Sequence, residues 1–200
     1  MNKFPRSAYV HIPFCHRRCF YCDFAVVPLG NNIESLNGYG SKTVKEYLNY
    51  LNKEILSIKY KYPLSTIYIG GGTPSILNPL QIKDLINLFK KNYRIDYGAE
   101  ITMEVDPASF NEDDLNGFIK AGINRFSLGA QSFNNQILEQ AGRRHSSKDV
   151  EKSCSWLKRA YDDGQIKSWS LDLIQNLPSS GSKEWQEDLK KSLDFCPPHI

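Results

Sequence analysis

Residues 7–22 read SAYVHIPFCHRRCFYC, a short strand-like run followed at once by a loop with three cysteines. Ser7–Ile12 has the alternation and β-branched content of a strand, and Cys15, Cys19 and Cys22 come directly after it. The chain has five cysteines in all, and the other two are isolated: Cys154 and Cys196. An odd number clustered in this way indicates a metal or cluster site in a reducing compartment rather than disulfide bonds.

The spacing C-x3-C-x2-C supplies three thiolates from one loop, and two kinds of metal centre fit it. A [4Fe–4S] cluster held by three cysteines keeps one iron without a protein thiolate, and that iron can chelate an amine and a carboxylate. A zinc ion needs a fourth ligand, which His11, His16 or Asp23 would supply. Zinc sites more often use paired C-x2-C motifs, and the sequence has no second pair. The spacing therefore favours the cluster, with a zinc-stabilised structural barrel as an alternative.

Beyond the loop, short β-rich runs alternate with longer amphipathic segments. The expected strands are Ser7–Ile12, Ser65–Ile69, Ala99–Val105, Ile123–Gly129 and Ser168–Ile174, and a sixth opens at His199-Ile200. Helices are expected within 44–58, 78–89, 111–122, 134–140, 148–162 and 182–195, and residues 28–40 form a flexible connection. This alternation predicts an α/β fold with parallel strands: one domain over residues 1–200, a partial (βα)6-type barrel cut short near the sixth strand.

Composition excludes several classes of function. The chain is 40% hydrophobic and 24% charged, with a formal net charge of +3, so it has material for a core and lacks the concentrated basic character of a nucleic-acid binder. No apolar run approaches the ~20 residues that span a bilayer, and residues 1–6 do not resemble a signal peptide. We therefore expect a cytoplasmic protein without a membrane span.

Polar residues and glycines stand at the ends of the expected strands, where barrels of this kind place their working groups. The cysteine loop follows the first strand and the segment GGGT (70–73) follows the second. Glu104, Gln131 and Asp172 lie at or near the ends of the next three. These positions predict one site at one mouth of the barrel. The residues expected to lie outside it are Asp106 in a turn before Pro107, His145 in an exposed loop, Cys154 in a helix core, and Cys196 in a structural position.

These motifs resemble those of radical S-adenosylmethionine (radical SAM) enzymes. The resemblance rests on two motifs: Cys15-x3-Cys19-x-Tyr21-Cys22, with an aromatic residue before the last cysteine, and the glycine-rich strand end Gly70–Pro74. Further segments narrow the resemblance to the HemN/HemW family: YVHIPFC (9–15), EVDP (104–107), RFSLG (125–129), QSF (131–133), GR (142–143), DLI (172–174) and LP (177–178). The resemblance covers the chain from about Tyr9 to its C-terminus and implies a radical SAM core domain.

The resemblance implies a [4Fe–4S] cluster on Cys15, Cys19 and Cys22, with S-adenosylmethionine on its open iron. It also implies cofactor contacts from a wider set: Tyr9, Tyr21, Gly71, Gly72, Thr73, Glu104, Gln131, Arg143 and Asp172. Carboxylates such as Glu104 and Asp172 can accept hydrogen bonds from an ammonium or from ribose hydroxyls, and Arg143 can pair with a carboxylate. Glycine suits positions 71 and 72 because a side chain would keep the ligand from the backbone.

The family contains oxygen-independent coproporphyrinogen III oxidases and haem chaperones. In the oxidases a 5′-deoxyadenosyl radical attacks the propionate side chains of coproporphyrinogen III, whereas the chaperones deliver haem to an acceptor protein. The oxidases carry a further cysteine two residues after the last cluster cysteine, and here that residue is Phe24. The resemblance therefore favours a HemW-type haem chaperone, with haem or a porphyrinogen, a flavodoxin or ferredoxin donor, and a haem acceptor as partners. The sequence leaves open whether S-adenosylmethionine is turned over or only bound, and so whether the protein is an enzyme.

Overall fold

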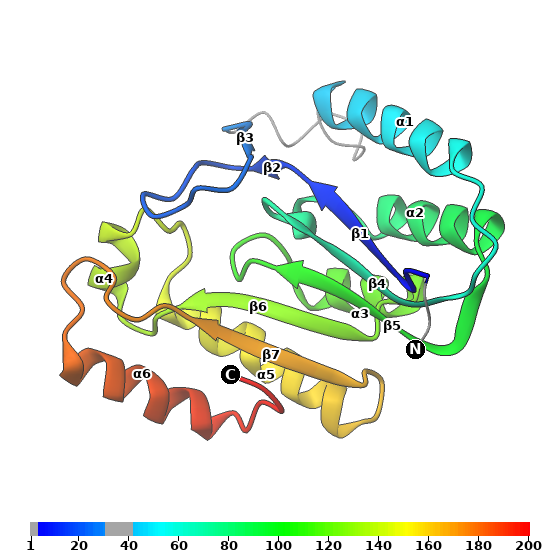
Figure 1. Ribbon diagram of the computed structural model, residues 1–200. Helices are drawn as coiled ribbons and strands as arrows, with labels where there is room; N and C mark the ends of the chain where they lie inside the picture. Colours follow the sequence, from blue (N-terminus) through cyan, green and yellow to red (C-terminus); the bar gives the residue numbers. More distant parts are fainter. Residues whose placement is uncertain (1–3, 31–41) are drawn as a thin grey trace.

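The computed structural model describes residues 4–30 and 42–200. Its main sheet has five parallel strands in the order β1-β4-β5-β6-β7 (Figure 1). Their bounds are β1 Ser7–Ile12, β4 Leu64–Gly71, β5 Ile95–Val105, β6 Arg125–Gln131 and β7 Ser168–Leu173. This order follows the chain, as it does in the wall of a barrel. A parallel bridge joins Ser170 to His199 beside β7, where the sequence predicts the sixth strand. The expected parallel α/β architecture is thus confirmed.

Helices α1, α2, α3 and α5 lie along one side of this sheet, whereas α4 lies beyond the strand ends, beside the cysteine loop (Figure 1). The helix bounds are α1 Lys42–Ser57, α2 Pro79–Asn92, α3 Glu112–Ala121, α4 Asn135–Gln140, α5 Ser147–Asp162 and α6 Ser182–Asp194, with a 3₁₀ turn η1 at Pro74–Ile76. Helix starts are fixed locally: the side chains of Asn78 and Asn111 each accept from the backbone of the third helical residue. Helix α3 ends at Gly122, whose φ of 114° is a left-handed conformation that suits glycine.

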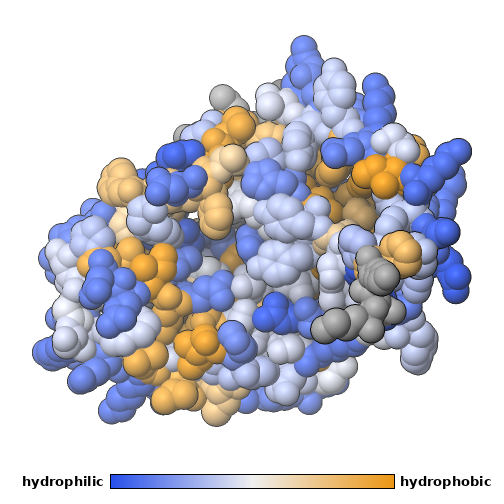
Figure 2. All heavy atoms as spheres, viewed as in Figure 1, coloured by the Kyte–Doolittle hydropathy of each residue, from blue (hydrophilic) through white to orange (hydrophobic). Residues whose placement is uncertain are grey.

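Each strand sends alternate side chains to opposite faces of the sheet. The face toward the helices is apolar and fully buried, as at Ile67, Phe126 and Trp169. The intervening positions carry polar side chains on the opposite face, among them Tyr68, Ser127 and Asp172. Figure 2 shows that this side of the molecule is hollowed. The sheet therefore separates a hydrophobic core from a polar inner surface.

The cysteine loop is tied down by a second, two-stranded sheet. Here β2 (Phe14–Cys15) pairs in parallel with β3 (Val27–Pro28). The backbone NH of Val27 donates to Pro13 O at 2.7 Å, and that of Leu29 donates to Cys15 O at 2.8 Å. The expected flexible connection at 28–40 lies mostly outside the described residues, and its first residue, Pro28, belongs to β3.

Several details differ from the sequence-based expectations. Strand β5 begins at Ile95 rather than Ala99, because Ile95 pairs with Leu64 at the start of β4, ahead of a register shift between Leu64 and Thr66. Helix α1 ends at Ser57, one residue before the expected end at 58, and Ile58 is 48% exposed. Cys154 is buried as predicted, whereas Cys196 is exposed just beyond the end of α6. In the described part of the chain, no helix is both long and apolar enough to cross a membrane.

Candidate functional site

A cavity of about 660 Å³ opens at the carboxyl ends of the strands. All of the site residues predicted from the sequence line it, with the exception of Tyr9. They arrive from separate elements: the cysteine loop after β1, the glycine turn after β4, Glu104 on β5, Gln131 at the end of β6 and Asp172 on β7. The expectation that the strand ends meet at one mouth is therefore confirmed by the geometry.

The three loop cysteines lie around one end of this cavity. Burial raises the pKa of the Cys15 thiol, a hydrogen bond from the Thr73 hydroxyl at 3.5 Å opposes this, and the neighbouring Cys22 and Cys19 raise it further. Among residues 4–30 and 42–200, no three His, Cys, Asp or Glu side chains are arranged to hold a single metal ion.

The glycine turn is joined to the start of the cysteine loop by backbone hydrogen bonds. Gly72 N donates to Ile12 O at 2.8 Å, and Thr73 N donates to Phe14 O at 2.7 Å. A Cβ at Gly72 would lie 2.6 Å from Phe14 O and 2.9 Å from Cys15 Sγ, which is too close for any side chain. Gly71 has a φ of 120°, so it too requires glycine. The GGGT segment thus brings bare backbone against the cysteine loop.

Two carboxylates project into the cavity from the inner face of the sheet. Glu104 accepts from the Tyr68 hydroxyl at 2.8 Å and from Gly71 N at 3.0 Å, and Asp172 accepts from the Ser127 hydroxyl at 2.6 Å. Burial raises the pKa of each carboxyl group, and these hydrogen bonds oppose the rise. Carboxylates in a partly desolvated cavity favour a cationic ligand, because a nearby positive charge stabilises their ionised form.

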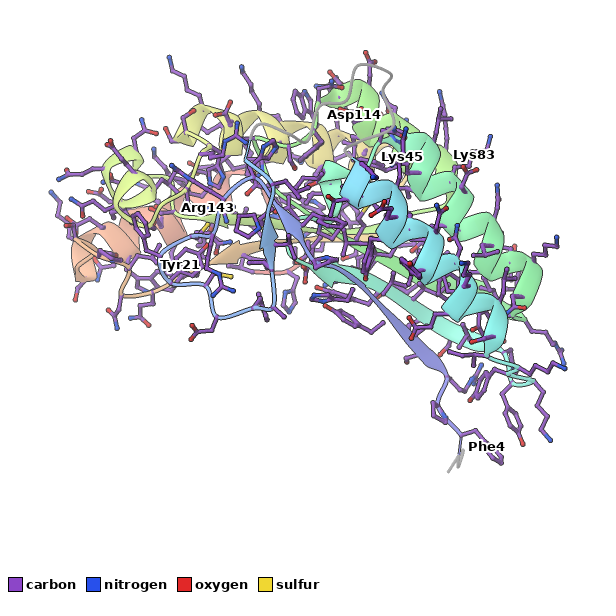
Figure 3. The ribbon with its side chains drawn as sticks, turned by 90° about the horizontal axis from the view of Figure 1, so that it is seen from above. Phe4, Tyr21, Lys45, Lys83, Asp114 and Arg143 are labelled. Atoms are coloured by element: carbon purple, nitrogen blue, oxygen red, sulfur yellow. The ribbon has the colours of Figure 1, made fainter. Side chains whose placement is uncertain are left out.

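Arg143 is the cationic counterpart of these carboxylates in the cavity lining. One terminal nitrogen, Nη1, lies 3.5 Å from Cys19 Sγ and 3.2 Å from the Tyr21 hydroxyl. Figure 3 shows Arg143 and Tyr21 together at the same end of the molecule. The other, Nη2, donates to Gly129 O at 2.9 Å and pairs with Asp106. Its Nε is buried without a hydrogen-bond partner in the described residues, which leaves one donor for a ligand.

Asp106 and His145 do not behave as the sequence predicts. Asp106 is part of the cavity wall and ion-paired with Arg143, rather than only a turn residue. Burial alone would raise its pKa, but the Arg143 guanidinium and His145 outweigh that effect and lower it to about 2. The His145 side chain is fully buried, not exposed, because its Nε2 lies 3.0 Å from Ala130 O and its Nδ1 lies 3.4 Å from Arg143 Nη2. Sequence alone carries little signal for either role, since both depend on contacts between distant segments.

Of the two remaining predicted residues, Gln131 lines the cavity and Tyr9 does not. Gln131 lines the cavity with a φ of 68°, a left-handed conformation at a register shift between β6 and β7. Such backbone strain in a non-glycine residue concentrates at functional sites. Tyr9 is 60% exposed on β1, where its hydroxyl lies 3.0 Å from His11 Nδ1 and its ring stacks on Tyr68. Its contact with a ligand stays a prediction.

Comparison with known proteins identifies the family of this chain. The sequence profile of the radical SAM superfamily matches residues 9–179. The chain belongs to the radical SAM superfamily. Members use a [4Fe–4S] cluster and S-adenosylmethionine, which agrees with the cofactors expected from the cysteine loop and the glycine turn.

Curated radical SAM relatives include the haem chaperone HemW of Synechocystis, 37% identical over 98% of this chain and 46% of its own length. HemW of Escherichia coli is 33% identical over 98% of this chain and 49% of its own length. The chain thus spans about half the length of the curated relatives it matches. Among solved structures, coproporphyrinogen III oxidase (HemN) of Escherichia coli has a TM-score of 0.81 and 30% identity, covering 96% of this chain and 42% of its own.

The residues around the cavity fit the two radical SAM cofactors. Three thiols surround one end, and the crowded approach of Gly72 to Cys15 leaves backbone rather than side chain beside them. S-adenosylmethionine carries a sulfonium and an ammonium, which suit two half-buried carboxylates, and a carboxylate, which suits the unpaired Nε of Arg143. The donor set of this chain is therefore chemically matched to both groups.

Proposed function

We propose that this chain is the radical SAM part of a HemW-type haem chaperone. In this proposal Cys15, Cys19 and Cys22 hold the [4Fe–4S] cluster. The contacts to S-adenosylmethionine come from the wider set predicted from the sequence: Tyr9, Tyr21, Gly71, Gly72, Thr73, Glu104, Gln131, Arg143 and Asp172. Similarity to curated haem chaperones along nearly the whole chain supports it, and so does the gathering of all these residues but Tyr9 around one cavity.

The observation that carries the choice of a chaperone is Phe24. It stands two residues after Cys22, where the oxidase pattern has a further cysteine, and it lies at the cavity with 65% of its surface exposed. Its carbonyl accepts from Arg18 at 2.8 Å, so the loop is held with a phenyl ring at this position. A phenyl ring can neither ligate iron nor transfer a proton, and this position therefore lacks the chemistry of a thiol.

When bound, the cluster and S-adenosylmethionine supply one-electron reductive chemistry. The chain's own residues bind and orient. Thr73 donates toward the Cys15 sulfur, and Arg143 donates toward the Cys19 sulfur, which stabilises negative charge on both thiolates. Glu104 and Asp172 bind the positively charged part of S-adenosylmethionine, and Val105 and Ile174 add apolar surface to the cavity wall.

The deciding experiment uses protein purified without oxygen and loaded with its cluster. A chaperone should bind haem stably, seen as a Soret band that co-elutes with the protein, and should not decarboxylate coproporphyrinogen III when given S-adenosylmethionine and a reductant. Decarboxylation would favour the oxidase instead, the second candidate, which the structural similarity to HemN supports. A protein that neither binds haem nor decarboxylates coproporphyrinogen III would contradict both functions.

Metal analysis of the same preparation tests the zinc alternative. We expect a brown protein with about four irons per chain. A colourless protein with one zinc would overturn the cluster assignment. The remaining partners belong to the same proposal: a flavodoxin or ferredoxin as electron donor, a haem-acceptor protein, and a cytoplasmic setting, which suits thiols that must stay reduced.

A further inference from the structure

The two cavity carboxylates are each held by a hydroxyl group from a neighbouring strand. On β5, the Glu104 carboxylate accepts one hydrogen bond at each oxygen: Tyr68 Oη donates to Oε1 at 2.8 Å, and Gly71 N donates to Oε2 at 3.0 Å. Two donors on two different oxygens fix the plane of the carboxylate. Glu104 is therefore unable to rotate without losing one of them.

The second carboxylate is held in a similar way. Ser127 on β6 donates to Asp172 Oδ2 at 2.6 Å, and Ser170 on β7 donates to the Ser127 hydroxyl oxygen at 3.1 Å. Ser127 has one hydrogen to give, and the bond from Ser170 directs that hydrogen toward Asp172. Ser127 also pairs in register with Glu104 across β5 and β6. One band of hydroxyls thus crosses β4, β6 and β7 beneath both carboxylates.

We propose that Tyr68 and Ser127 are positioning residues that hold Glu104 and Asp172 in the orientation that binds the cationic part of S-adenosylmethionine. This inference rests on the proposed S-adenosylmethionine site. Neither residue lies in the set implied by the family resemblance, and each acts through a carboxylate rather than on the ligand. Tyr68 is well suited to this role because its ring stacks on Tyr9 with the centroids 6.1 Å apart, which restrains the direction of its hydroxyl.

Tyr68 also affects the protonation of Glu104. Burial raises the pKa of the Tyr68 hydroxyl, so it remains a donor, and its hydrogen bond favours the charged form of Glu104. The other groups that act on Glu104 are Gly71 N and the His11 side chain, which lower its pKa, and Asp172, which raises it. Removing only the Tyr68 hydroxyl should therefore raise the Glu104 pKa further. On acidification, Glu104 would then be protonated at a higher pH than in the wild type, and a bound cation would lose its carboxylate partner at that pH.

The test measures S-adenosylmethionine affinity by calorimetry on the cluster-loaded protein, from mildly acidic to mildly alkaline pH. Tyr68→Phe keeps the ring and should weaken binding about tenfold, the effect of losing one hydrogen bond to a charged group. Its affinity should also begin to fall at a higher pH than in the wild type. Ser127→Ala should weaken binding to a similar degree. Iron content should be unchanged in both variants, because neither residue contacts a cysteine sulfur in the described structure.

Tyr93→Phe is the matched control, because Tyr93 Oη donates to Ile55 O at 3.0 Å away from the cavity. It removes a hydroxyl of the same kind and should leave both affinity and pH profile unchanged. Wild-type affinity and pH profile in both Tyr68→Phe and Ser127→Ala would overturn the inference. If Tyr68→Phe fails to fold, Ser127→Ala alone decides. A wild-type protein that binds no S-adenosylmethionine would instead overturn the proposed cofactor site, and the inference with it.

Discussion

Asp106 keeps its charge inside the cavity wall because Arg143 lies against it. Its carboxylate side chain is 21% exposed, and the Arg143 side chain is only 11% exposed, so solvent screens the pair little. The same guanidinium reaches the Cys19 sulfur and the Tyr21 hydroxyl. At the scale of single residues, Asp106 therefore sets the position of a cation beside a cysteine of the loop.

The Asp106 charge should make stability depend on pH. A carboxyl group whose pKa falls from about 3.9 in the unfolded chain to about 2 in the fold stabilises the protein above the higher value. That contribution, about 2–3 kcal/mol, is lost as the pH falls from about 4 to about 2. Asp106→Asn should therefore lower the free energy of unfolding at neutral pH, and the difference from the wild type should shrink in acid. Urea unfolding followed by circular dichroism at several pH values measures it.

Asp194, at the exposed end of α6, provides the control for this series. Asp194→Asn should track the wild type across the pH range. A difference between Asp106→Asn and the wild type that does not change with pH would contradict the expected linkage.

Gly72 is the residue least able to accept a side chain. Gly72→Ala would place a methyl group 2.6 Å from Phe14 O and 2.9 Å from Cys15 Sγ, so the cysteine loop must shift. We expect iron per chain to fall to less than half the wild-type value, since misplacing one ligand weakens a site that depends on three. Iron analysis and absorbance near 400 nm measure it.

Gly181→Ala is the matched control for Gly72→Ala, because within residues 4–30 and 42–200 its new methyl group would meet only the flexible Glu184 carboxylate, at 3.1 Å. It should load with iron normally. Equal iron content in the two variants would show that the close approach at Gly72 does not matter.

The sequence predicted the residues of the site better than it predicted their supports. The cysteine spacing, GGGT and the strand-end carboxylates are local patterns, and the structure brings them to one cavity as expected. The expectations for Asp106 and His145 are wrong because each side chain is held by a residue from another segment. Asp106 pairs with Arg143, and His145 contacts the carbonyl of Ala130. Tyr68 lies within the expected strand Ser65–Ile69, and no sequence pattern pairs it with a carboxylate. Which hydroxyl meets which carboxylate depends on strand register, which no single segment specifies.

At the scale of elements, α6 is fastened to the turn that follows β6. The Asp188 carboxylate in α6 accepts from Phe133 N at 2.7 Å and is 4% exposed, and the Phe133 ring stacks on Phe195 just beyond the helix. The turn begins at Gln131, whose backbone is in the left-handed region. Helix α6 thereby helps hold a strained residue of the cavity wall.

Removing the Asp188 carboxylate should loosen this turn. Asp188→Ala leaves Phe133 N buried without its acceptor, and we expect the free energy of unfolding to fall by about 1–3 kcal/mol. Amide hydrogen exchange should become faster at residues 131–134. Glu187→Ala, on the exposed side of the same helix, removes only a weak ion pair with Lys183 and should cost about 0.5 kcal/mol or less. Equal effects of the two changes would contradict this view of α6.

Over the whole molecule, the five cysteines fall into three environments. Cys15, Cys19 and Cys22 border the cavity, Cys154 is buried between α5 and the sheet, and Cys196 is exposed. Burial raises the pKa of the Cys154 thiol to about 12, so it has almost no thiolate at neutral pH. The fold thus assigns a different reactivity to each group of thiols.

Alkylation followed by mass spectrometry should reveal this order. In the native, cluster-loaded protein we expect one label, on Cys196. After the cluster is removed the three loop cysteines should also react, and Cys154 should react only after unfolding. Rapid labelling of Cys19 or Cys22 in the loaded protein would mean that these thiols do not hold the cluster.

The backbone bonds from Gly72 and Thr73 to Ile12 and Phe14 also have an evolutionary consequence. They tie two motifs from different βα units into a single structural piece, so a substitution in one changes the fit of the other. Homologous chains should then vary at the two motifs together, and a graft that transfers the cysteine loop alone into another barrel should fail unless the glycine turn is transferred with it. The cysteine loop and the glycine turn must therefore be kept or transferred together.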